Sequence, residues 1–180
     1  KRLPFTDAFV DESVRGRRYL MACVMAEARH LPDLRPAIRA LAVYERVHFN
    51  NESDTQKRHV LSAIAEMPIG VFVAVSHRAH GESEFIARNA CLARIVEVVQ
   101  ERQVSRLVIE SRDDNKKTSE DERQLVRVRR PEPSLVFEHR RGSAEPMLWI
   151  ADAVAWAHGA GSRWRRLIDP VVQDVSEVRP

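Results

Sequence analysis

The sequence predicts an α/β fold, a mixed β-sheet flanked by helices. Two apolar segments rich in β-type residues, 5–11 and 19–27, are separated by a short polar link, which favours an antiparallel hairpin. A continuous apolar run over residues 71–75 precedes a long helical stripe over 82–102 and a further apolar segment over 106–110. Strand, helix and strand in this order predict a βαβ unit, whose strands are parallel. The sheet is therefore expected to combine antiparallel and parallel strands.

Two further helices are predicted between the hairpin and residue 71. Residues 32–43 carry apolar side chains at helical spacing, and residues 54–66 do the same. Asp54 is a suitable N-cap for the second helix. The intervening residues 46–49 are short and contain β-type side chains, which makes them a candidate strand.

The C-terminal third combines a loop, a short strand and a helix. Residues 111–122 are polar and have no periodicity, which predicts a mobile loop, with a helical turn from Glu120 as an alternative for its end. Residues 135–137 predict a last short strand. Pro146 is well placed as the first residue of a helix that runs to about His158, and Gly159 closes it.

The composition indicates one domain over residues 1–180. The chain has 180 residues, of which 44% are hydrophobic and 31% charged, so it is long enough to bury a core. No apolar run approaches the roughly 20 residues that span a bilayer, and we expect no membrane segment. Cys23 and Cys91 lie in apolar stretches, which favours reduced core cysteines and a cytoplasmic protein.

Arginine gathers in three short clusters. They are Arg15, Arg17 and Arg18; Arg127, Arg129 and Arg130; and Arg163, Arg165 and Arg166. Because guanidinium groups bind phosphate in bidentate geometry, the first and third clusters are predicted to contact DNA or RNA. A solvated surface in an arginine-rich chain is the alternative interpretation.

Three acidic residues stand at the ends of apolar segments, or inside them, far apart in sequence. Asp11 follows one apolar run, Glu110 ends another, and Asp152 interrupts a third. A carboxylate beside a core is costly to desolvate without a partner, and clustered carboxylates usually bind a hard divalent cation. If the three acids meet, at least one should have a raised pKa in the absence of metal. The pattern predicts metal-assisted phosphoryl chemistry.

Each acid also has a structural interpretation. Asp11 opens the turn-forming sequence Asp-Glu-Ser, where it can accept backbone N–H groups. Glu110 can form an ion pair with Arg112 or a neighbouring arginine. Asp152 lies beyond any N-cap position, in a helix interior where Asp is unfavourable. A buried Asp there needs a metal, an arginine or other hydrogen-bond donors.

Four other residues are auxiliary candidates. Asp121 is a candidate fourth metal ligand, although a solvated charge is its simpler interpretation. Glu12, His48 and Arg112 are candidates for supporting positions around the acids, and Glu12 should point away from Asp11 if the strand continues. No serine stands in a nucleophile elbow, and the six glycines form no phosphate loop, which argues against serine hydrolases and P-loop enzymes.

The order of these motifs resembles the ribonuclease H-like superfamily. A hairpin strand that ends in Asp-Glu-Ser at Asp11, a later strand that ends at Glu110, and a late Ala-Asp helix at Asp152 carry the resemblance. More narrowly, the chain resembles an uncharacterised prokaryotic domain family that opens with an Asp-Glu-Ser strand and closes on an Ala-Asp helix. Residues 32–66 have no obvious counterpart in a minimal ribonuclease H.

The resemblance implies a mixed sheet with acids gathered at its centre around Mg²⁺ or Mn²⁺. Asp11 matches the first-strand acid, Asp152 the late-helix acid and Glu110 the middle acid, with Asp121 as a further ligand. It also implies two-metal hydrolysis of a phosphodiester, in which one ion activates water and the other stabilises the leaving oxygen.

Three functions are therefore compatible with the sequence. The first is a metal-dependent nuclease of ribonuclease H-like fold. The second is a non-catalytic nucleic-acid- or protein-binding module of the same fold in a larger assembly, and the mobile-element or defence context comes only from the resemblance. The third is a metal-carboxylate hydrolase that acts on a small phosphorylated molecule.

Overall fold

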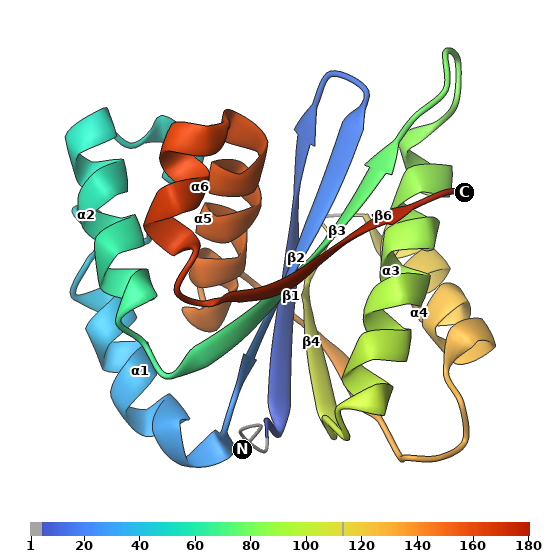
Figure 1. Ribbon diagram of the computed structural model, residues 1–180. Helices are drawn as coiled ribbons and strands as arrows, with labels where there is room; N and C mark the ends of the chain where they lie inside the picture. The colour runs from blue at the N-terminus through green and yellow to red at the C-terminus, as the bar shows by residue number, and fades with distance from the viewer. Residues whose placement is uncertain (1–4, 113) are drawn as a thin grey trace.

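A six-stranded mixed sheet runs through the middle of the molecule in the order β5-β4-β1-β2-β3-β6 (Figure 1). The computed structural model describes residues 5–112 and 114–180. The strands are β1 (Asp7–Arg15), β2 (Arg18–Ala26), β3 (Ile69–His77), β4 (Arg106–Glu110), β5 (Val136–Arg140) and β6 (Val172–Val178). The β1–β2 and β2–β3 pairs are antiparallel, whereas β1–β4, β4–β5 and β3–β6 are parallel. The predicted mixed α/β sheet is confirmed.

Helices cover both faces of this sheet. They are α1 (Leu31–Arg39), α2 (Asp54–Ala65), α3 (Glu84–Glu101), α4 (Asn115–Val128), α5 (Met147–Ala160) and α6 (Ser162–Ile168), with short 3₁₀ turns η1 (Ala28–His30) and η2 (Phe49–Asn51). Figure 1 shows α1, α2, α5 and α6 on one face and α3 and α4 on the other. Each helical layer packs on its own apolar core. The predicted βαβ unit is present, because β3 and β4 run in the same direction with α3 between them in sequence, although β2 and β1 separate them in the sheet.

Strand alternation decides which helical layer each side chain of β1 meets. Phe9 belongs to the core beneath α5, whereas Val10 belongs to the core beneath α3. Successive side chains of a strand point to opposite faces, so Asp11 follows Phe9 toward α5 and Glu12 follows Val10 toward α3. The fully buried Ala151 of α5 is one of the small residues that let this helix pack on β1 and β2.

The short strand predicted over residues 46–49 is wrong. These residues have no strand partner, and the 3₁₀ turn η2 begins at Phe49. Val47 and Phe49 are 1% and 0% exposed. Val47 and Phe49 are therefore apolar because they fix an irregular connection to the core. Two buried apolar residues in an irregular segment give the same sequence pattern as a short strand.

The mobile loop predicted over residues 111–122 is also wrong for most of its length. Helix α4 begins at Asn115, and the Asp114 side chain caps it by accepting the backbone N–H of Lys116 at 2.8 Å. The buried face of this helix carries Asp121 and Gln124 beside its apolar residues. Residues 115–122 contain no apolar side chain, and the buried member among them is Asp121, so this part of the helix has no apolar period in its sequence.

Both cysteines agree with their prediction. Cys23 and Cys91 are buried and form no disulfide, and both belong to the core beneath α3. Over residues 5–112 and 114–180, none of the helices is both long enough and apolar enough to span a bilayer.

Candidate acidic active site

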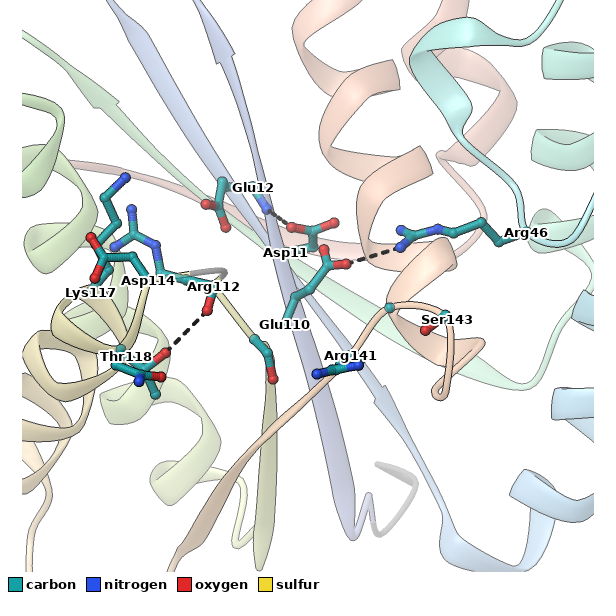
Figure 2. A pocket seen from close by; sticks show the side chains of 13 residues that line it. Asp11, Glu12, Arg46, Glu110, Arg112, Asp114, Lys117, Thr118, Arg141 and Ser143 are labelled. Carbon is teal, nitrogen blue, oxygen red and sulfur yellow. Dashed lines mark hydrogen bonds and ion pairs between the residues drawn. The ribbon is translucent and has the colours of Figure 1, made fainter.

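A cleft of about 960 Å³ opens where strands β1 and β4 separate (Figure 2). The last residues paired between these strands are Val10 and Ile109, and the next residues along each strand are Asp11 and Glu110. Parallel strands in register present equivalent positions to the same face, so both carboxylates point toward α5. The cleft is lined by acidic residues Asp11, Glu12, Glu110 and Asp114 and by basic residues Arg46, Arg112, Lys117 and Arg141.

Asp11 and Glu110 are held in different ways. Asp11 is 9% exposed, and its Oδ1 accepts the backbone N–H of Glu12 at 2.8 Å. Glu110 is more open, and its Oε1 accepts from Arg46 Nη1 at 3.3 Å. Figure 2 shows Arg46 reaching Glu110 from the segment before η2, on the side away from Arg112.

Asp152 approaches the same place from α5. Its Oδ2 lies 3.4 Å from the backbone nitrogen of Phe49, which donates to it. Burial, and then the charge of Glu110, raise the pKa of Asp152 to about 6, although the Phe49 N–H and the charge of Arg46 lower it. Because these effects require proximity, Asp152 shares the electrostatic environment of Glu110.

The pKa of Asp11 is raised well above its usual value. Burial is the largest cause, followed by the negative charges of Glu12, Glu110 and Asp152. The structure therefore brings the three predicted acids within electrostatic reach of one another, and the raised pKa values of Asp11 and Asp152 agree with the expectation for neighbouring carboxylates.

The donors at this site suit a hard cation, because Mg²⁺ and Mn²⁺ prefer carboxylate oxygens. Their arrangement is open, however. Within the described part of the chain, no three His, Cys, Asp or Glu side chains are close enough together to hold a metal ion. The positive charge beside Glu110 is instead the guanidinium of Arg46.

Comparison with solved structures identifies the fold. The chain is similar to ribonuclease H2 from Pyrococcus horikoshii OT3, with a TM-score of 0.53 and 13% sequence identity over 83% of this chain and 70% of that chain. The chain has a ribonuclease H-like fold. No protein-family model matches the sequence, and no curated protein matches it. At 13% identity the likeness establishes the ribonuclease H-like architecture alone.

Glu12 and Asp121 belong to an ionic group centred on the buried Arg88, in which Glu12 also lines the cleft. Arg88 Nε and Nη2 donate to the two carboxylate oxygens of Asp121, each at 2.8 Å. Arg88 Nη1 contacts Glu12 Oε1 at 2.8 Å and Tyr19 Oη at 3.1 Å. Asp121 is only 1% exposed and does not line the cleft. Its predicted role as a further metal ligand is therefore not carried into the proposed site.

Two arginines of the site, Arg88 and Arg46, are not among the residues predicted from the sequence. Arg88 stands on the apolar stripe of α3 between Ala87 and Cys91, and an arginine on an inner helix face signals a buried acidic partner. Arg46 had no such signal, because it lies in an irregular connection. Arg46, and not Arg112, forms the ion pair with Glu110. Arg112 lines the cleft and lies 3.8 Å from Asp121. His48 is exposed and is not among the residues that line the cleft.

The first and third arginine clusters meet at the C-terminal end of α5. Arg18 donates to the carbonyl oxygen of Gly159 at 2.9 Å, and Arg165 donates to that of His158 at 2.7 Å. Arg15 lies 4.9 Å from the ring centroid of Trp156. The exposed members of the two clusters are Arg17, Arg163 and Arg166. The two clusters thus form one basic surface at the C-terminal end of α5. Along this helix, the surface lies more than one turn beyond Asp152.

Gly142 packs against the ion pair of the cleft. A Cβ atom at this position would overlap Glu110 Oε1 and Arg46 Nη1, while its carbonyl oxygen accepts from Trp149 Nε1 at 2.6 Å. The overlapping atoms are the ends of flexible side chains, so they can move aside at low cost. Position 142 therefore controls whether the pair can form.

We expect Gly142→Ala to fold normally and to separate Glu110 from Arg46. Partly exposed ion pairs contribute about 0–1 kcal/mol, so the free energy of unfolding should change by no more than about 1 kcal/mol. A double-mutant cycle with Arg46→Gln and Glu110→Gln should show coupling in the wild type and none in the Gly142→Ala background. Ser143→Ala is the matched control and should leave the coupling unchanged; equal coupling in both backgrounds would contradict the prediction.

Proposed function

We propose that the chain is a metal-dependent nuclease that hydrolyses phosphodiester bonds of a nucleic acid, with Asp11, Glu110 and Asp152 as ligands of Mg²⁺ or Mn²⁺. The observation that supports this proposal best is the register of β1 and β4, which makes Asp11 and Glu110 the first positions beyond the pairing of these two parallel strands. Glu110 is the last residue of β4, whereas β1 continues past Asp11 to Arg15. Clefts at the carboxyl ends of parallel strands such as β4 are the usual ligand sites of α/β sheets. Asp152 adds a third carboxylate from α5.

The chemistry of these residues fits that role. When bound, divalent cations lower the pKa of a coordinated water and stabilise the leaving oxygen of a phosphodiester. Burial and mutual repulsion raise the pKa of Asp11 and Asp152, so both carboxylates gain from positive charge. Arg112, Lys117 and Arg141 line the same cleft and can neutralise the phosphates of a bound strand.

The basic surface at the end of α5 is a second region that a longer substrate would contact. We assign it to backbone binding by Arg15, Arg17, Arg18, Arg163, Arg165 and Arg166. Contacts of this kind release counterions, so the affinity for DNA or RNA should fall steeply as the salt concentration rises. Arg17→Gln with Arg166→Gln should reduce the slope of log affinity against log salt by about 1–2, because each phosphate contact contributes about 0.7–0.9.

The Asp-Glu-Ser and Ala-Asp motifs support a finer assignment. We propose on this basis that the chain belongs to the uncharacterised prokaryotic domain family that it resembles, as one ribonuclease H-like domain over residues 1–180 acting in the cytoplasm. A protein partner in a mobile-element or defence assembly would fit this context.

A second function is favoured by one contact. Arg46 already supplies positive charge at Glu110, as expected for a ribonuclease H-like module that binds nucleic acid or protein without catalysis. Such a module would bind polynucleotides in a salt-dependent manner and would need no metal.

Two measurements distinguish these functions. Labelled single-stranded DNA, single-stranded RNA and an RNA–DNA hybrid are incubated with the protein and Mn²⁺, and Mn²⁺ binding is measured by calorimetry. A nuclease should bind Mn²⁺, cleave at least one substrate and lose cleavage in EDTA. Asp11→Asn should lower the rate by at least about 100-fold, because removal of even an indirect partner of a metal ligand costs 10–100-fold.

Asp114→Asn is the matched control for this experiment. Asp114 lines the same cleft but lies at the start of α4, and Asn is an equally good N-cap. The variant should therefore keep both the fold and the activity. Nucleic-acid binding without Mn²⁺ binding or cleavage would replace the nuclease with the binding module.

A further inference from the structure

We propose that Arg46 is the resident counter-cation of the acidic site and that a divalent cation binds there only when Arg46 leaves Glu110. This inference rests on the proposed function and concerns the regulation of the same site. Arg46 would then set the metal concentration at which the site fills.

The contact between Arg46 and Glu110 is a single one. Arg46 Nη1 lies 3.3 Å from Glu110 Oε1, and among the described residues Arg46 forms no other hydrogen bond with a side chain or backbone. Its Nε is buried without a partner. A guanidinium has five N–H donors, so this one is poorly satisfied and can be exchanged at low cost.

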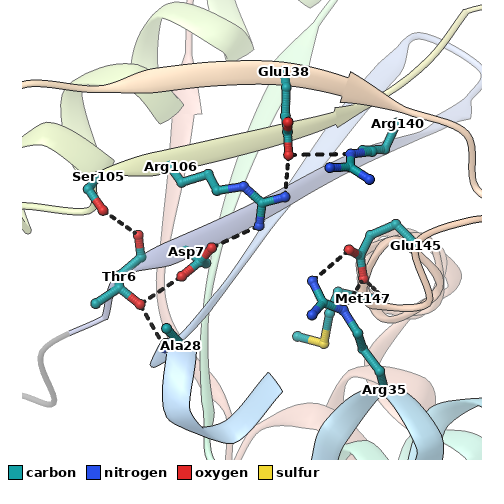
Figure 3. Close-up of polar contacts among 10 residues, drawn as sticks. All are labelled: Thr6, Asp7, Ala28, Arg35, Ser105, Arg106, Glu138, Arg140, Glu145 and Met147. Atoms are coloured by element: carbon teal, nitrogen blue, oxygen red, sulfur yellow. Dashed lines mark hydrogen bonds and ion pairs between the residues drawn. The ribbon is translucent and has the colours of Figure 1, made fainter. Parts of the chain in front are cut away.

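Other ion pairs of the same chain show what a permanent arginine–carboxylate contact looks like here. Arg35 binds Glu145 through two hydrogen bonds, with Nε 3.0 Å from Oε1 and Nη2 2.8 Å from Oε2 (Figure 3). Arg88 binds Asp121 in the same bidentate way. Bidentate pairs are stronger and more specific than single contacts. The Arg46–Glu110 pair is therefore the weak member of this set.

The charge balance of the site favours exchange. Among the described residues, Arg46 is the single base within 4.0 Å of Glu110, and no base lies that close to Asp11 or Asp152. At contact distance, the three carboxylates thus share one guanidinium, which touches only Glu110. A divalent cation carries twice the charge of Arg46 and can contact several oxygens at once, so it should compete well for this position.

The position of Arg46 allows it to move. It lies between the exposed residues Val43 and Tyr44, which are 61% and 81% exposed, and Val47, which is 1% exposed. Arg46 therefore stands where a segment with exposed side chains meets a residue that is anchored in the core. Rotation of the Arg46 side chain, with little change in the core, is sufficient to release Glu110.

The experiment is calorimetric titration of Mn²⁺ into the wild type, Arg46→Gln and Arg141→Gln. Arg141 lines the same cleft, so its variant removes an equal charge without breaking the contact to Glu110. We expect Arg46→Gln to bind Mn²⁺ about five- to tenfold more tightly than the wild type. Loss of a partly exposed ion pair that competes with the metal changes the affinity by up to about fivefold, and removal of the positive charge increases the affinity further. Arg141→Gln should change the affinity by less than about twofold, since salt screens the more distant charge.

Thermal unfolding provides a second readout that does not depend on activity. Mn²⁺ should raise the Tm of Arg46→Gln more than that of the wild type or Arg141→Gln, because a ligand stabilises the folded state by RT ln(1 + L/Kd), where L is its free concentration, and tighter binding therefore stabilises it more. If Arg46→Gln does not fold, Arg46→Met takes its place, because it keeps an apolar stem of similar length and removes the charge. The same gain is expected for it.

Two outcomes would overturn the proposal, and they have different meanings. If the wild type binds Mn²⁺ and the Arg46 variants bind it equally or more weakly, Arg46 is not a competitor and the proposed nuclease stands. If none of the proteins binds Mn²⁺ with or without a nucleic acid, both the metal site and the role of Arg46 are wrong.

Discussion

Asp152→Asn is expected to abolish Mn²⁺-dependent cleavage and, at the same time, to stabilise the protein at neutral pH. Burial, and then the charge of Glu110, raise the pKa of Asp152 to about 6 from an ordinary value of 3.8. The ionised carboxylate is therefore unfavourable in the folded state. Asn cannot ionise, and its side-chain oxygen can still accept the backbone N–H of Phe49 that Asp152 accepts now.

The sign of the pH dependence follows from the direction of this shift. A carboxyl group whose pKa is higher in the folded state favours folding below its unfolded pKa, and that contribution is lost as the pH rises through the folded value. Wild type and Asp152→Asn should therefore have similar stability near pH 3.8 and below. Above pH 6 the variant should be more stable by about 1–3 kcal/mol, since one unit of pKa corresponds to about 1.4 kcal/mol.

Urea denaturation at pH 4 and pH 7.5, with and without Mn²⁺, measures this effect. Asp174→Asn is the control, because Asp174 is an exposed acid on β6 and its variant should behave as the wild type. Retained cleavage in Asp152→Asn, or equal stability of the two proteins at pH 7.5, would show that Asp152 is not a strained member of the site. A stabilised but inactive variant is the expected trade-off at a functional site.

Asp121→Ala is expected to be the most destabilising single change considered for this chain, at about 3–5 kcal/mol. Arg88 and Asp121 are 2% and 1% exposed, and removal of one partner leaves the other charge buried and uncompensated. Burial by itself raises the pKa of Asp121. Contacts with His139 and Arg88 and the charge of Arg112 outweigh burial and lower this pKa to about 2. Its contribution should be complete above pH 4 and lost as the pH falls toward 2.

Urea denaturation of Asp121→Ala, Asp121→Asn and Glu122→Ala tests this prediction. Glu122 is exposed on the same helix, so its variant should cost less than about 0.5 kcal/mol. Mn²⁺ affinity provides the second readout. An unchanged affinity in Asp121→Asn would assign Asp121 to structure, whereas a lost affinity in a folded Asp121→Asn would restore it as a metal ligand.

Local pattern was sufficient to predict most of the elements around the site. The strand that ends at Glu110, the long helix α3 and the helix that carries Asp152 were predicted near their observed positions. The strand that carries Asp11 was predicted to end there, but β1 continues to Arg15. The apolar periodicity of each of these elements lies within one continuous stretch of residues. That stretch alone therefore indicates whether the element buries one face or two. The same reasoning failed at α4, because the helix buries polar side chains such as Asp121 through a partner on another element.

The sequence by itself determined which carboxylates stand at the edges of the core, namely Asp11, Glu110 and Asp152. Only the tertiary structure decided what surrounds them. The register of β1 and β4 makes Asp11 and Glu110 neighbours, and Arg46 reaches Glu110 from 64 positions away. Such pairings depend on how strands and connections that are distant in sequence pack together. The residues of an ion pair are close only in the folded chain, so the pair leaves no periodic signal in the sequence.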